Sequence, residues 1–170
     1  IAVAPLGVLP YFADLETVDM LGLTDPVTAR TGYAIEPYYP GHVRMARPQH
    51  LVDRGVNLVL AQPGSADIEP GREAYRLSEL TSLYPSVDLN QLPADAQVIE
   101  IPQIDGQVWL IIYLTQNDAV DEAIDRNGWD VYPIDPTCVI EDMDVVEGSG
   151  PLVDLANGLS RMVGERTCPS

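Results

Sequence analysis

An uninterrupted apolar run from Val108 to Leu114 (VWLIIYL) limits the folds open to this chain. Successive side chains of a β-strand point to opposite faces, so a strand that is apolar at every position is buried on both faces. Asp105-Gly106 precedes the run and favours the tight turn of a hairpin whose first strand is 98–101. The run therefore predicts a central strand of a sheet that helices cover on both sides.

Other strands and helices are predicted around this hairpin. A proline at a first helical position and a glycine just past the last one mark several short helices. We expect strands at 1–5, 17–21 and 56–61, and helices at 26–31, 48–54, around 72–82, 118–127 and 151–163. The chain has 170 residues, 46% of them apolar. Together these features predict one α/β domain over 1–170, with a mixed, mostly parallel sheet, short helices on both faces and one β-hairpin.

The charge of the chain excludes some partners. Twenty-six acidic residues face nine arginines and no lysine, for a net charge of −17. Such a surface repels nucleic acid and anionic lipid head groups, so we expect neither as a direct partner. A salt-adapted or GC-rich source, or an acidic face for basic partners, would each account for the charge. The sequence has no nucleotide-binding glycine pattern and no metal-ligand spacing, so no cofactor and no metal are predicted.

The stretch Thr17–His42 combines a strand, a helix start and an aromatic loop. Asp25 is placed to cap the helix that begins at Pro26. Asp19 lies six residues earlier. The two carboxylates form either a pair for acid–base or metal chemistry or, more simply, a helix cap and a tie for neighbouring loop N–H groups. Residues 33–42 hold three tyrosines, two prolines and a glycine, which predicts a structured loop rather than a strand.

This stretch also carries a resemblance to a known family. The residues concerned are Asp19, Gly22, Leu23, Asp25, Arg30, Pro40, Gly41 and His42. Their spacing resembles a pattern in the C-terminal soluble domains of membrane glycosyltransferases that use polyprenyl-phosphate sugars, among them the arabinofuranosyltransferases of cell-wall arabinan synthesis. The match covers roughly the first 60 residues. Val43-Arg44 stands where the family has Glu-Lys, so a carboxylate and an ammonium group of that loop are replaced.

The resemblance implies an extracytoplasmic domain excised from a larger membrane protein. Such a domain is non-catalytic, because the catalytic aspartate of the family lies in an early loop of the membrane part. Its expected partners are the membrane domain of the parent protein and a polysaccharide acceptor. Residues 1–4 would be the first strand after a final membrane helix. The start at Ile1 and the absence of a visible signal peptide agree with an excised or processed chain.

Candidate glycan-binding residues gather in and before the aromatic loop. Sugar rings pack on aromatic faces, while planar polar groups bind their hydroxyls. The candidates are Arg30, Tyr33, Tyr38, Tyr39 and His42. Tyrosines in proline-rich loops also cover cores, which is the alternative interpretation. His42 and His50 would need a third partner to bind a metal, and none stands at a known spacing.

The extracytoplasmic location favours a disulfide between Cys138 and Cys168. Cys168 is the third-last residue, in a part of the chain where an untethered tail frays. Two unrelated buried thiols are the alternative, and the pair lacks neighbours that would complete a zinc site.

Three classes of function stay open. The first is the non-catalytic glycosyltransferase domain, which the resemblance favours. The second is a stand-alone hydrolase that uses carboxylates such as Asp19 and Asp25, although no complete catalytic set is present. The third is an extracellular carbohydrate-binding or structural domain.

Overall fold

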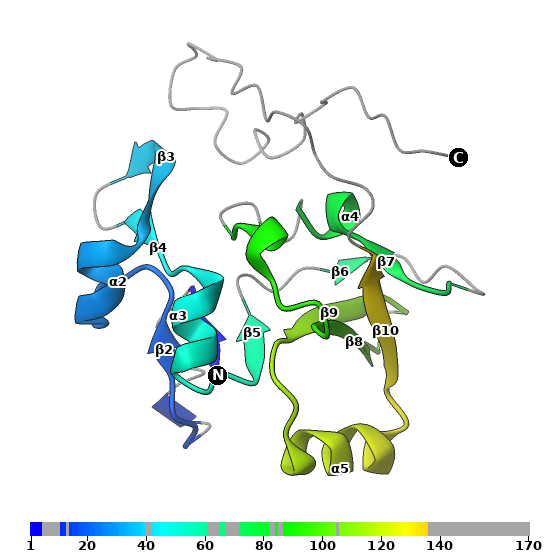
Figure 1. Ribbon diagram of the computed structural model, residues 1–170. Helices are drawn as coiled ribbons and strands as arrows, with labels where there is room; N and C mark the ends of the chain where they lie inside the picture. The colour runs from blue at the N-terminus through cyan, green and yellow to red at the C-terminus, as the bar shows by residue number, and fades with distance from the viewer. Residues whose placement is uncertain are drawn as a thin grey trace.

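A mixed sheet organises the part of the chain that the computed structural model describes (Figure 1). The described residues are 1–4, 11–12, 14–39, 42–60, 65–66, 72–81, 84, 87–104 and 106–135, with the backbone alone described for 35–39, 42–43 and 65–66. Cys138, Cys168 and the helix predicted at 151–163 lie outside them. None of the helices in these ranges is long and apolar enough to span a membrane.

Eight strands pair in the main sheet of the described chain. Seven follow one another in the order β2 (Val18–Asp19), β1 (Ala2–Val3), β5 (Leu58–Leu60), β9 (Val108–Tyr113), β8 (Gln97–Pro102), β10 (Asp130–Asp135) and β7 (Tyr75–Arg76), while β6 (Ser65–Ala66) pairs with β9. The pairs β1–β2, β1–β5 and β7–β10 are parallel and the others antiparallel. The predicted α/β class and mixed sheet are confirmed, but the prediction that the sheet is mostly parallel is wrong: within the described strands, β9 pairs antiparallel with β5, β6 and β8, and β10 pairs antiparallel with β8. The short hairpin loop forces β8 and β9 to run in opposite directions.

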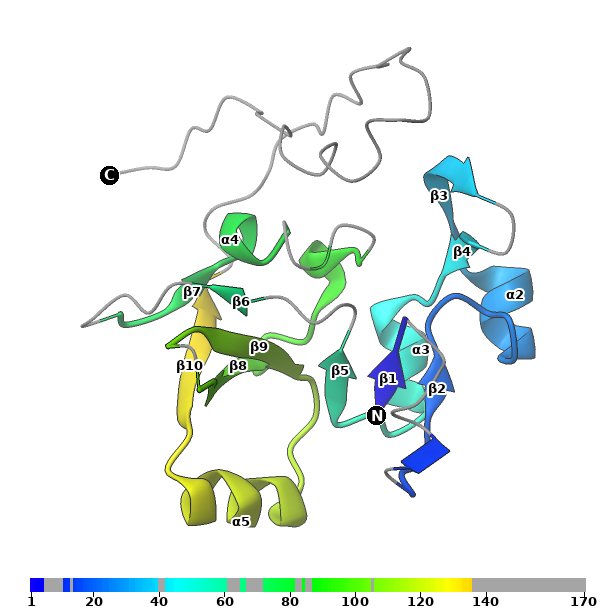
Figure 2. The same ribbon diagram turned by 180° about the vertical axis from the view of Figure 1, so that it is seen from behind.

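The apolar run in β9 lies between two cores, as its pattern predicts. Val108, Leu110 and Ile112 face one core and Ile111 and Tyr113 face the other, and all five are buried. The first face is covered by α3 (Pro48–Asp53), α4 (Leu77–Thr81) and the 3-10 helix η1 (Leu89–Gln91), and the second by α5 (Asp118–Asn127). Figures 1 and 2 show α4 and α5 on opposite sides of β8 and β9, so helices on both faces are confirmed.

Local signals placed the ends of α2 (Pro26–Thr31) and α5 correctly, whereas the helix predicted around 72–82 is confined to α4, because residues 75–76 form β7. The Asn117 side chain accepts hydrogen bonds from the N–H groups of Ala119 and Val120 at the start of α5. Gly128 closes that helix in the left-handed conformation, with a φ of 64°. The helix α2 has the predicted bounds, and its cap is Asp25.

The hairpin predicted from Asp105-Gly106 is confirmed by its two strands. Gln103 N–H donates to the carbonyl of Gln107 at 2.8 Å and closes the loop between β8 and β9. Gly106 has a φ of 86°, a conformation that L side chains rarely adopt. Asp105 itself lies outside the described residues.

The prediction of a loop at 33–42 is wrong. This segment supplies β3 (Tyr33–Tyr39) and the start of β4 (His42–Met45), which form a separate two-stranded antiparallel sheet. The pairing is interrupted between Ala34 and Tyr39. Pro37 falls in this interval, and a strand tolerates a proline where its N–H is not needed by the ladder. The proline content therefore marked an irregular strand, not a loop.

Candidate functional site

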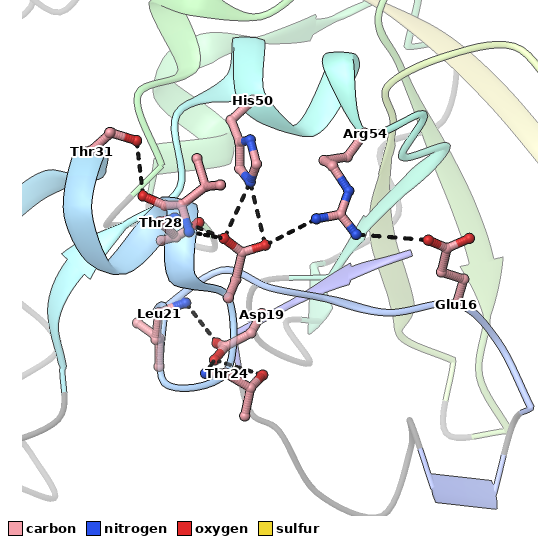
Figure 3. Close-up of polar contacts among 10 residues, drawn as sticks. Glu16, Asp19, Leu21, Thr24, Thr28, Thr31, His50 and Arg54 are labelled. Atoms are coloured by element: carbon pink, nitrogen blue, oxygen red, sulfur yellow. Dashed lines mark hydrogen bonds and ion pairs between the residues drawn. The ribbon is translucent and has the colours of Figure 1, made fainter.

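A buried carboxylate joins three segments of the chain next to the edge of the sheet (Figure 3). We call Glu16, Asp25, His50 and Arg54 the Asp25 cluster. The side chain of Asp25 is 5% exposed. Its Oδ1 accepts hydrogen bonds from the N–H groups of Val27 (2.9 Å) and Thr28 (2.8 Å), which caps α2 as predicted.

The other contacts of Asp25 come from α3. His50 Nε2 lies 3.4 Å from the carboxylate, and Arg54 Nη1 lies 3.4 Å from Oδ2. The two residues stand four positions apart, so they share one face of the helical turn. Arg54 Nη2 also lies 3.8 Å from Glu16 Oε1, on the segment that leads into β2. One carboxylate thus links the start of α2 to α3.

The Asp25 cluster closes the base of a longer unit. Between α2 and α3 the chain forms the β3–β4 hairpin. Two arginines, one in β4 and one just after it, also donate hydrogen bonds directly to the C-terminal end of α2. Arg44 Nη1 donates to the carbonyl of Gly32 at 2.8 Å, and Arg47 Nε donates to that of Thr31 at 3.0 Å. These arginines satisfy carbonyl groups at the C-terminal end of α2. The hairpin is therefore held at both ends of α2.

Asp19 organises the loop that leads to Asp25. Its Oδ1 accepts a hydrogen bond from Leu21 N–H (2.9 Å), and its Oδ2 accepts from the N–H (2.6 Å) and hydroxyl (3.2 Å) of Thr24. Asp19 is 1% exposed. Both of its oxygens are thus occupied by the turn that follows β2 (Figure 3).

Gly22 lets this turn pack against α2. Its φ is 72°, and a Cβ built there would lie 2.7 Å from the backbone nitrogen of Ala29. Real Cβ atoms essentially never come so close to backbone, so the glycine is required both by conformation and by space. Asp19, Gly22 and Asp25 together form one local structure, which we call the clasp.

Opposing effects act on the pKa of Asp25. Burial raises it, whereas the hydrogen bond from Thr28 N–H and the hydrogen bond and charge of His50 lower it. The lowering effects prevail, and the pKa lies below its ordinary value. The carboxylate is therefore kept ionised at neutral pH, which suits an electrostatic link between two helices better than proton transfer.

The clasp has little capacity for chemistry. Both oxygens of Asp19 and the Oδ1 of Asp25 accept hydrogen bonds from loop and helix N–H groups, and both side chains are buried. The Oδ2 of Asp25 lies 3.4 Å from His50 Nε2 and from Arg54 Nη1. Across the described ranges no three His, Cys, Asp or Glu residues are grouped as a metal ion would require. The geometry matches the simpler of the two interpretations of the pair, a cap and a tie for loop N–H groups.

The candidate glycan-binding residues are divided by the structure. Tyr33 points inward: it packs against the first core, and its hydroxyl accepts a hydrogen bond from Asp88 N–H at 2.6 Å. Burial raises the pKa of Tyr33. Arg30 is exposed in the last turn of α2. Tyr39 and His42 are paired residues of the β3–β4 backbone, and with Tyr38 they lie where only that backbone is described.

A second polar network was not predicted from the sequence. The Tyr75 hydroxyl donates to Glu100 Oε1, and Arg72 lies with its guanidinium 4.0 Å from the centre of the Tyr75 ring. Arg72 also forms an ion pair with Glu79 at 3.1 Å and lies 4.0 Å from Glu100. Glu100 is 5% exposed in β8. In the sequence, this network could have been suspected from the glutamate that interrupts the apolar run Val98–Ile101.

The chain belongs to a family of domains of unknown function, DUF8728, whose model matches residues 1–119. This range contains the clasp, the β3–β4 hairpin, and the sheet up to β9. A search of curated proteins and a search of solved structures found no match.

Proposed function

We propose that this DUF8728 chain is a non-catalytic extracytoplasmic domain of a polyprenyl-phosphate-sugar-dependent membrane glycosyltransferase. In this proposal the domain supports the membrane part of the enzyme and holds the polysaccharide acceptor. The resemblance of Asp19–His42 to such domains is the reason for proposing this class of enzyme, and the geometry of the clasp supports a non-catalytic role.

The observation that carries the proposal is that the carboxylates of Asp19 and Asp25 are occupied by hydrogen bonds within the protein. A catalytic carboxylate needs a free oxygen directed at the substrate, and a catalytic acid or base needs a pKa near the working pH. Both aspartates instead accept hydrogen bonds from the backbone around them, and the pKa of Asp25 is lowered. The residues that carry the resemblance are thus better suited to hold a structure than to react.

The structure held by the clasp is the β3–β4 hairpin. It stands apart from the main sheet as a separate ladder and lies beside α2 in both views (Figures 1 and 2). The hairpin and the adjacent end of α2 carry Tyr38, Tyr39, His42 and Arg30. Tyrosine rings and planar polar groups are the mixture that sugars bind. A short hairpin fixed at its base would present these groups to a glycan chain.

Nuclear magnetic resonance tests this proposal. The ¹⁵N-labelled chain is titrated with short arabinan and mannan fragments. We expect shifts confined to residues 30–45, with millimolar affinity, which corresponds to about −4 kcal/mol. Tyr39→Ala should abolish them and leave the remaining spectrum intact. Tyr33→Phe is the matched control, because the Tyr33 hydroxyl is bound to Asp88 N–H. Absence of shifts at tens of millimolar glycan would contradict the acceptor role and leave that of a support.

A further inference from the structure

The segment from Pro26 to Arg54, which carries α2, the β3–β4 hairpin and α3, reverses the charge of the chain. It holds four of the nine arginines and both histidines but only two acidic residues, whereas the whole chain has a net charge of −17. Three of its arginines, Arg30, Arg44 and Arg47, either lie in the last turn of α2 or donate hydrogen bonds to that end of the helix. We call these three residues the arginine triad.

Backbone contacts fix two members of the triad close together. Arg44 Nη1 donates to the carbonyl of Gly32 at 2.8 Å, and Arg47 Nε donates to that of Thr31 at 3.0 Å. These carbonyls belong to consecutive residues, whose Cα atoms are about 3.8 Å apart. The backbone of β4 approaches this point closely, since a Cβ built at Gly32 would lie 2.6 Å from the Met45 carbonyl oxygen. Both guanidinium groups are therefore anchored at one end of α2 before any ligand binds.

The contacts with α2 use little of the charge or donor capacity of the triad. A guanidinium group has five N–H donors, and each of the two carbonyl bonds uses one. The C-terminal end of a helix carries about half a negative charge, against three positive charges on the triad. In the part of the chain that the structure describes, the ion pairs of carboxylates are made with His50, Arg54, Arg72 and Arg126 and not with the triad.

One described carboxylate acts near Arg47 without pairing with it. Burial raises the pKa of Tyr33, the hydrogen bond from Asp88 N–H and the charge of Arg47 lower it, and the charge of Asp88 raises it. Asp88 and Arg47 therefore both lie near the Tyr33 hydroxyl. The Asp88 carboxylate accepts a hydrogen bond from Gln91 Nε2 and, although the structure describes both residues, forms no ion pair with Arg47. It offsets one charge at most, so the triad keeps an excess of positive charge.

We propose that the arginine triad binds an oxyanion substituent, a carboxylate or a phosphate, of the glycan that the β3–β4 hairpin holds. Planar guanidinium groups bind carboxylate and phosphate oxygens in pairs. Because Arg44 and Arg47 are already anchored on α2, they lose less conformational freedom on binding than unattached side chains would. Arg44 follows His42 by two residues along β4, about 7 Å, which a short oligosaccharide spans. The inference rests on the proposed acceptor role and names the class of acceptor, an anionic glycan.

Matched oligosaccharides separate the effect of charge from that of the sugar. The ¹⁵N-labelled full chain is titrated with a short uronic-acid oligomer and with its methyl ester, which keeps the sugar chain but lacks the charge. A sugar phosphate and its parent sugar form a second pair. We expect the anion of at least one pair to bind about ten times more tightly than its neutral counterpart, with shifts at the side-chain Nε–H signals of Arg44 and Arg47. The two pairs show which oxyanion is preferred, and added salt should reduce the preference.

Variants that remove one charge identify the residues responsible. Arg44→Gln and Arg47→Gln each keep an amide donor, and each should weaken binding of the anion about tenfold while the affinity for the neutral counterpart stays unchanged. Arg126→Gln is the matched control, because it removes the same charge from an exposed arginine of α5 and should leave both affinities unchanged. Arg30→Gln, at an exposed position of α2, covers the case in which the first two variants do not fold.

The outcomes separate this inference from the proposed function. Equal affinities for the charged and neutral members of both pairs would overturn the inference and leave the acceptor role standing. A preference for the anion that all three triad variants retain would overturn it as well. If none of the four compounds produces shifts at tens of millimolar, the acceptor role itself fails, and the inference fails with it.

Discussion

His50 Nε2 lies 3.4 Å from both carboxylate oxygens of Asp25 and so connects the middle of α3 to the first turn of α2. The two residues are 25 positions apart, and the β3–β4 hairpin lies between them in the chain. One buried anion therefore fixes the base from which the hairpin extends.

Replacing Asp25 should destabilise the protein in a pH-dependent way. Asp25→Ala removes a helix cap and the partner of His50 and Arg54, and we expect a loss of about 2 kcal/mol in the free energy of unfolding at pH 7. Asp25→Asn keeps the cap and should cost about 1 kcal/mol. Urea denaturation measures both. A cost for Asp25→Ala no larger than that for Asp25→Asn would contradict the cap.

The lowered pKa of Asp25 defines how its contribution to the free energy of unfolding changes with pH. The pKa of Asp25 in the folded chain lies below its ordinary value, so its contribution is present above the unfolded pKa of about 3.9. It is lost as the pH falls through the lower folded pKa. The stability difference between the wild type and Asp25→Asn should therefore shrink as the pH falls below about 4. A difference that grows as the pH falls below about 4 would contradict this account.

Gly22 and Gly55 form a matched pair. Both have positive φ, 72° and 66°, but a Cβ at Gly55 meets nothing within 4 Å. Gly55→Ala should cost about 1 kcal/mol, the penalty of the left-handed conformation alone. Gly22→Ala should cost about 3 kcal/mol, because the backbone of α2 must also move. Equal midpoints of thermal unfolding would show that the turn does not pack as described.

Substitutions at Arg72 and Glu100 should have strongly non-additive effects on the free energy of unfolding. Arg72→Met leaves the buried Glu100 carboxylate without this cation, and we expect a loss of about 3 kcal/mol. Glu100→Gln in the same chain should restore part of it, since the neutral amide no longer requires a positive charge. A double-mutant cycle by urea denaturation measures the coupling. If the effects of the two single variants on the free energy of unfolding simply add in the double variant, the proposed interaction between Arg72 and Glu100 is contradicted.

Tyr33→Phe distinguishes a structural tyrosine from a ligand-binding one. The hydroxyl accepts the hydrogen bond of Asp88 N–H at 2.6 Å, and its loss leaves that donor without this partner. We expect a cost of about 1 kcal/mol. Denaturation detects the loss, and amide exchange at Asp88 should become faster. Unchanged stability would contradict an inward, structural role of Tyr33.

Local sequence signals predicted much of the fold. Asp25-Pro26 and Asn117 define helix starts, Gly55 and Gly128 mark helix ends, and Asp105-Gly106 indicated the hairpin, because each acts on neighbouring residues. The balance of parallel and antiparallel pairs was harder to predict, because it depends on which distant strands become neighbours.

The candidate site shows the same limit. The sequence identified Asp25 as a cap but not His50 as its partner, since their contact joins two helices across the intervening hairpin. It interpreted the tyrosines and prolines of 33–42 as a loop, although Pro37 falls where the ladder is irregular. Glu100 was not singled out in the sequence, and its partner Tyr75 lies 25 residues away.

Glycosyl transfer by the purified chain tests the central claim most directly. The chain is incubated in detergent with a polyprenyl-phosphate sugar and a glycan acceptor, and product is compared with a protein-free blank. We expect the same product in both, because the clasp aspartates are buried and bound by their own loop and helix. Turnover by the wild type that Asp25→Asn abolishes without loss of fold would contradict the account.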